Sequence, residues 1–102
     1  MKEELELRNE ISALVHKIVV LVRKERTIPR EQIFILINLL EKFREFSKGR
    51  EVIPKRMAYE LFYLYTNVSS QLSYNKYEDT SIFTELYMAI TSVFNDGLYN
   101  KE

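Results

Sequence analysis

Apolar residues recur every three to four positions along most of the chain, which is the period of a helix with one buried face. This pattern predicts four helices, over about residues 2–25, 29–48, 54–73 and 80–96. No segment sustains the alternation of apolar and polar residues that is typical of a half-buried strand. The sequence therefore predicts an all-α protein.

Each predicted helix has an apolar stripe that we expect to face the core. In the first two helices the stripes are Leu7, Ile11, Leu14, Val15, Ile18, Leu21 and Val22, then Ile33, Leu36, Ile37, Leu40 and Phe43. In the last two they are Ala58, Leu61, Phe62, Tyr65, Val68 and Leu72, then Ile82, Phe83, Leu86, Ile90, Val93 and Phe94. A second stripe on residues 29–48 (Ile35, Leu39 and Phe46) would be buried by neighbouring helices or by a second copy in a homodimer.

Glycine and proline mark the ends of the predicted helices. Gly49 and Gly97 each follow a long periodic segment, where a left-handed residue closes a helix. Pro29 and Pro54 lie near helix starts, and Thr27 is a candidate N-cap. The connections are short, so we expect each helix to return beside the preceding one. This arrangement is an antiparallel up-down-up-down four-helix bundle, formed as a single domain by residues 1–102.

Composition excludes several classes of protein. The chain has 102 residues, 15 cationic and 15 anionic side chains and no cysteine. A neutral domain lacks the overall basic charge of a nucleic-acid binder, and a chain without cysteine has neither disulfides nor thiolate metal sites. The acidic N-terminus has no apolar signal-peptide core, and no apolar run reaches the ~18–20 residues that span a bilayer. We therefore expect a cytoplasmic protein whose contact with membranes is peripheral at most.

The expected topology brings opposite charges together at the two ends of the bundle. At one end Glu3, Glu4 and Glu6 would lie near Lys48, Arg50, Lys55 and Arg56. At the other end Arg23, Lys24, Arg26 and Arg30 would lie near Glu78 and Asp79. We interpret these groups mainly as solvated, internally paired helix ends. The alternative is that the cations contact an anionic partner, such as lipid head groups or nucleic acid, with an anionic-surface contact at Lys48, Arg50, Lys55 and Arg56.

Few residues suggest catalysis. His16 is the only histidine, and there is no glycine-rich phosphate loop. An all-α metal-dependent nucleotide hydrolase would need carboxylates directed into the bundle from two helices, but Glu60 and Glu85 are scattered. Asn38 interrupts an apolar run, and we interpret it as a polar residue that fixes helix register. We expect no enzyme activity, no metal and no cofactor.

Aromatic residues are more numerous than a small core requires, with seven tyrosines and six phenylalanines. We expect Phe62 and Tyr65 to be buried. Tyr59, Tyr63, Tyr74 and Tyr77 cannot all face inward at helical spacing, so part of the set is exposed. Exposed tyrosine provides a large contact area with a polar tip, which suits protein interfaces. The surplus is therefore either a structural feature or a recognition surface.

Residues 53–99 resemble a known family. The stretch includes Leu-Phe-Tyr-Leu-Tyr-Thr-Asn at residues 61–67, Tyr-Asn-Lys-Tyr at 74–77 and Gly-Leu-Tyr at 97–99. These residues resemble the immunity proteins for pediocin-like (class IIa) bacteriocins, of the enterocin A immunity type. Over residues 1–50 the similarity is looser and consists mainly of length and helix pattern.

The resemblance implies a cytosolic four-helix bundle that protects a cell from a pore-forming peptide. It implies action from the cytoplasmic side on a membrane sugar-phosphotransferase permease that has bound the bacteriocin, with the C-terminal half setting which bacteriocin is resisted. We therefore expect the partner to contact Tyr59, Tyr63, Tyr74, Asn75, Lys76, Tyr77, Asn95, Asp96 and Tyr99. The helices over residues 2–25 and 29–48 would mainly complete the bundle. The alternative function is a small, non-catalytic helical adaptor of another system.

Overall fold

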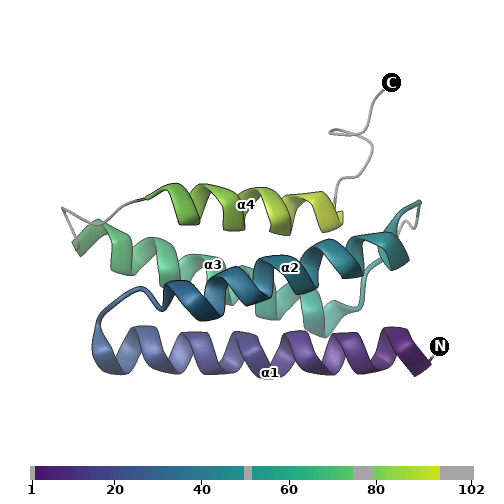
Figure 1. The fold of residues 1–102 in the computed structure, drawn as a ribbon, viewed down its shortest axis with the longest axis horizontal. Helices are drawn as coiled ribbons and strands as arrows, with labels where there is room; N and C mark the ends of the chain where they lie inside the picture. Colours follow the sequence, from purple (N-terminus) through teal and green to yellow (C-terminus); the bar gives the residue numbers. More distant parts are fainter. Residues whose placement is uncertain (1, 50–51, 75–79, 95–102) are drawn as a thin grey trace.

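Four α-helices make up the computed structural model, which describes residues 2–49, 52–74 and 80–94 (Figure 1). They are α1 (Lys2–Glu25), α2 (Arg30–Ser47), α3 (Lys55–Tyr74) and α4 (Ser81–Phe94). No strand occurs in these ranges, so the prediction of an all-α protein is confirmed. The observed bounds of α1, α2 and α3 agree with the predicted ones within one residue. The end predicted for the last helix, at residue 96, lies outside the described residues.

The helices contact one another in an order that differs from their order in the sequence. α1 packs against α2 and α3, and α4 packs against α2 and, over a smaller area, against α3. Thus α3 lies mainly beside α1, whereas we expected it to return beside α2. The connection over residues 48–54 permits this, because it can extend about 23 Å. In a bundle whose neighbouring helices lie about 10 Å apart, diagonally opposite helices lie only roughly 14 Å apart, which is within this reach.

Backbone geometry explains where the helices begin and end. Pro29 takes the N-cap position of α2, and its carbonyl accepts the amide hydrogen of Ile33 at 3.0 Å. The Pro54 carbonyl accepts the amide hydrogen of Ala58 at 3.1 Å in the same way. The prediction that Thr27 caps α2 is therefore wrong. Gly49 has a φ of +81° and closes α2 as predicted, while Gly97 lies outside the described residues.

The core is built from the inward stripes of all four helices. The five residues predicted for α2 are all buried, as are the following residues predicted for the other helices: Leu7, Ile11, Val15, Ile18, Val22, Leu61, Val68, Leu86, Ile90 and Val93. Leu14, Leu72, Ile82 and Phe83 are partly buried against this core. Leu39 and Phe46 of the second α2 stripe also pack against it, while Ile35 is half exposed.

Two predicted core positions, Phe62 and Phe94, are wrong. Phe62 is 67% exposed because the inward line of α3 passes through Met57, Leu61 and Leu64. Phe62 follows Leu61 by one residue, a rotation of 100° about the helix axis, and so points outward. Phe94, at the end of α4, is also exposed, at 44%.

The polar residues singled out in the sequence lie on the surface. Asn38 is exposed, so it does not fix helix register from within the core, and His16 is exposed on α1.

None of the helices, over the residues that the structure describes, is both long enough and apolar enough to cross a bilayer.

Candidate functional site

The outward surface of α3 carries an aromatic band, which we define as Tyr59, Phe62 and Tyr63. Tyr59 is 65% exposed and Phe62 is 67% exposed, whereas Tyr63 is half-buried against the core. Residues three and four positions apart are neighbours on a helix surface, which groups these side chains. The rings of Tyr59 and Tyr63 stack with centroids 5.9 Å apart and planes 9° apart. The band therefore presents aromatic surface to solvent.

Tyr63 accepts side-chain hydrogen bonds, one of which joins the aromatic band to α1. The guanidinium of Arg23 on α1 donates from Nη1 to the Tyr63 hydroxyl at 2.7 Å. Asn67 Nδ2 donates to the Tyr63 carbonyl at 2.9 Å, one turn further along α3. The hydrogen bond to α1 and the stacking on Tyr59 both restrain the Tyr63 ring. A pre-ordered surface loses less side-chain entropy on binding.

A second aromatic group closes the interface between α3 and α4. The Tyr65 ring lies 5.1 Å from that of Phe83 and 5.8 Å from that of Tyr87, in tilted geometry. Tyr65 is partly buried and packs against the core, close to its predicted position. Tyr65, Phe83 and Tyr87 thus pack between α3 and α4, as a group separate from the exposed band.

The structure brings together only part of the predicted partner-binding set. Tyr59 and Tyr63 are adjacent, whereas Tyr74, which is 78% exposed, lies at the other end of α3, about 16–22 Å along the helix axis. Six further predicted contacts lie outside the described residues: Asn75, Lys76, Tyr77, Asn95, Asp96 and Tyr99. Phe62 was missed as a surface residue because its apolar character had placed it in the predicted core.

The predicted anionic-surface contacts are only partly described. Lys48, Lys55 and Arg56 are exposed, and Arg50 lies outside the described residues. Arg56 Nε lies 3.3 Å from Glu60 Oε2, one helical turn away. Such an exposed pair contributes about 0–1 kcal/mol. Glu60 also accepts a hydrogen bond from Ser12 Oγ at 2.7 Å, which joins α3 to α1.

Three cavities follow one another along the seam between α1 and α3. The first, of about 240 Å³, lies beside Arg8 and Arg56. The second, of about 280 Å³, lies beside Val20, Tyr59 and Tyr63. The third, of about 730 Å³, lies beside Arg23 and Arg26. The seam is therefore hollowed along much of its length, and the aromatic band borders its middle.

The described residues assemble no arrangement typical of catalysis. Over these ranges, no group of three or more histidine or acidic residues is placed to hold a metal ion. Glu60 faces the seam with α1, whereas Glu85 lines a groove between α2 and α4, so the two carboxylates do not converge. Surface recognition is the property that the arrangement supports best.

Comparison of the chain with protein-family models, curated proteins and solved structures finds no match. The exposed aromatic band and the hollowed seam beside it are consequently the features from which function is inferred.

Proposed function

We propose that this chain is a non-catalytic immunity protein of the pediocin-like (class IIa) bacteriocin type. In this proposal it acts from the cytoplasmic side of the membrane, on a sugar-phosphotransferase permease that has bound a pore-forming peptide. The observation that carries the proposal is the exposed aromatic band of α3, which lies within the part of the sequence that resembles this family.

The proposal includes an antiparallel up-down-up-down course of the four helices. In Figure 1 the end of α1 and the start of α2 lie at the same end of the molecule as the end of α3 and the start of α4. Near the opposite end, Ser47 Oγ on α2 donates to the Val93 carbonyl on α4 at 3.4 Å. The last turns of α2 and α4 are therefore neighbours, which supports alternating helix directions.

Physical chemistry favours binding as the role of the aromatic band. Large aromatic side chains left in water contribute little to stability, but they provide most of the energy of many protein interfaces. Tyr59 and Phe62 are available for contact, and Tyr63 holds the Tyr59 ring by stacking. A few such anchors are sufficient for a recognition surface.

The test measures protection and stability together. We expect Tyr59→Ser combined with Phe62→Ser to abolish the protection of a sensitive strain that expresses the chain, with little change in the free energy of unfolding. Phe34→Ser is the matched control, because Phe34 is a similarly exposed aromatic residue (56%) on α2. Challenge with a panel of class IIa bacteriocins is the readout. Full protection by the double variant would contradict the assigned surface.

A chimera tests where specificity lies. Residues 53–102 are grafted onto the first half of an immunity protein with a different resistance profile, and cells are challenged with both bacteriocins. Resistance should follow the grafted half. If the wild-type chain protects against no class IIa peptide, the immunity proposal fails, and the adaptor function becomes the better explanation of the aromatic band.

A further inference from the structure

The three cavities between α1 and α3 form one continuous seam. The first two share Ser12 and Glu60 as lining residues, and the second and third share Arg23. From Ser12 to its end at Glu25, α1 advances about 20 Å at 1.5 Å per residue, which is close to the length of a helical segment of about 14 residues. The seam is therefore long enough for a segment of a partner protein.

The character of the seam changes along its length. Its middle has an apolar and aromatic part, which includes Val20, Tyr59 and Tyr63, and a polar part made of Ser12, His16, Arg23 and Glu60. The large cavity beyond it is lined mainly by polar groups, and among the residues that the structure describes its charged lining residues are Arg23 and Arg26. A complementary ligand would place apolar side chains in the middle and an anionic group at the arginines.

Arg26 adopts a backbone conformation that ordinarily favours glycine. Its φ is +57°, in the left-handed region that costs energy for a residue with a Cβ. Gln71 Nε2, on the largely buried Gln71 of α3, donates to the Arg26 carbonyl at 2.9 Å and holds this turn against α3. This hydrogen bond fixes the backbone of Arg26 at the end of α1, beside the large cavity that Arg26 lines.

Arg23 is positioned by a separate contact. Its Nη1 donates to the Tyr63 hydroxyl at 2.7 Å, which links the basic end of the seam to the aromatic band. A guanidinium has five donors, so this bond leaves donors for a ligand. Arginine pairs with carboxylates through two parallel hydrogen bonds, a geometry that lysine cannot reproduce.

We propose that the α1–α3 seam binds an acidic amphipathic segment of a protein partner. Carboxylates of the segment pair with Arg23 and Arg26, and its apolar side chains lie against Val20, Tyr59 and Tyr63. The inference rests on the proposed function in one respect, that the chain acts by binding a protein. It adds α1 as half of the binding surface. Continuity with the aromatic band favours a peptide over a lipid head group, which would use the cations alone.

The experiment uses the full chain and a synthetic probe. The probe is a helical peptide of about 14 residues, with leucines on one face and two glutamates at one end. We expect the Nε–Hε NMR signals of Arg23 and Arg26 to shift on titration. Replacing the glutamates by glutamines should weaken binding about tenfold or more, as expected when charge-assisted hydrogen bonds are lost. Shifts with inorganic phosphate or anionic vesicles but not with the peptide would overturn the proposal.

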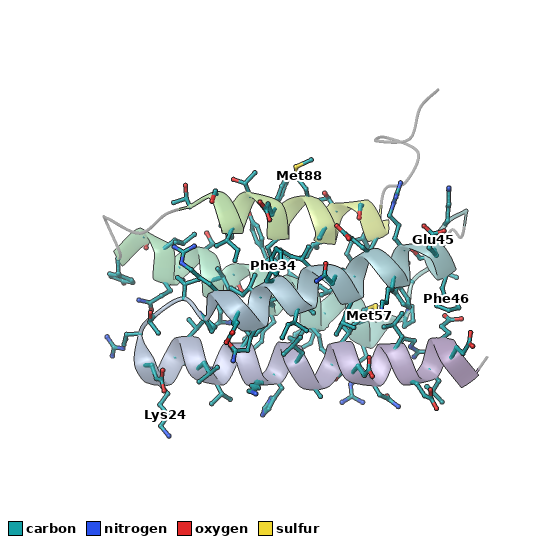
Figure 2. The ribbon with its side chains drawn as sticks, in the orientation of Figure 1. Lys24, Phe34, Glu45, Phe46, Met57 and Met88 are labelled. Atoms are coloured by element: carbon teal, nitrogen blue, oxygen red, sulfur yellow. The ribbon has the colours of Figure 1, made fainter. Side chains whose placement is uncertain are left out.

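Arg26→Gly separates binding from stability. Glycine relieves the strained backbone, so we expect the melting temperature to rise by about 2–6 °C while peptide affinity falls about tenfold or more. Lys24→Gln is the matched control, because it removes the same charge from a side chain that points away from the bundle (Figure 2). The control should change affinity less than about twofold. Equal losses in both variants, or unchanged affinity in Arg26→Gly, would overturn the proposal.

These outcomes are independent of the immunity proposal. Peptide binding in a chain that gives no resistance would refute the immunity function and retain the seam as a binding site. If the chain does not bind the peptide and Arg26→Gly leaves resistance unchanged, the seam is not a binding site and the immunity function is retained.

Discussion

The helices α2 and α3 are similar in length but use their large apolar side chains differently. Phe43 of α2 is fully buried, together with the whole inward stripe of that helix. α3 buries a line of smaller residues, including Leu61, and exposes Tyr59 and Phe62 on its outer surface. α2 also exposes Phe34 and Ile35, so the two helices differ in how their exposed rings are grouped: α3 places Tyr59, Phe62 and Tyr63 in one band, whereas α2 exposes a single aromatic ring.

Substitution of Phe43 should give the largest effect on stability. Phe43→Ala leaves a cavity at a position with no exposed surface, so we expect it to lower the free energy of unfolding by about 3–5 kcal/mol. Phe34→Ala, on the exposed side of the same helix, should cost less than about 1 kcal/mol. Urea unfolding of both variants measures the two values. Similar losses would show that burial on α2 is not one-sided.

Adjacent residues of α3 allow a sharper version of this comparison. Leu61→Ala should lower the free energy of unfolding by about 2–5 kcal/mol, because Leu61 is fully buried. We expect Phe62→Ala to cost less than about 1 kcal/mol, although it removes a larger side chain. Both values come from the midpoints and slopes of urea unfolding curves. If Phe62→Ala is the more damaging of the two, the orientation of α3 is incorrect.

A smaller effect is expected where α3 holds the end of α1. Gln71→Met keeps most of the side-chain volume but removes the donor to the Arg26 carbonyl, so we expect a loss of about 1–2 kcal/mol. Hydrogen exchange at the Arg26 amide should also become faster, since that amide closes the last turn of α1 on the Val22 carbonyl. The same substitution at Gln32 of α2 serves as control. An unchanged exchange rate would show that the Gln71 hydrogen bond does not stabilise the end of α1.

Much of this fold follows from apolar periodicity. The inward stripe of α2 was predictable because charged residues such as Glu41, Lys42 and Glu45 occupy its outer side. The side of α3 that faces the core is harder to predict, because apolar and aromatic residues occur on nearly all sides of this helix. Periodicity led us to place Phe62 in the core and to leave out Leu64, which was wrong: Met57, Leu61 and Leu64 form the buried line.

The candidate site was only partly predictable. The tyrosine surplus indicated an exposed surface on α3, and Tyr59 and Tyr63 lie there. The contribution of α1 was missed because we expected α3 to return beside α2, and pairing across helices depends on connections that periodicity does not specify. The burial of Gln71 could have been predicted, because this polar residue follows Val68 by three positions on the apolar line of α3. Its partner, the backbone carbonyl of Arg26, has no signature in the sequence.

The pairing of α1 with α3 and of α2 with α4 has a consequence for the order of folding. The contacts that join these pairs are far apart in the chain, as between Ser12 and Glu60, separated by 48 residues. During synthesis α1 and α2 can pack against each other, but the parts of their stripes that face α3 and α4 stay uncovered until the second half has left the ribosome. Closing such long loops before burying apolar surface slows folding relative to a bundle of sequential hairpins. We infer that α1–α2 is not an autonomous folding unit and that the chain collapses as a whole.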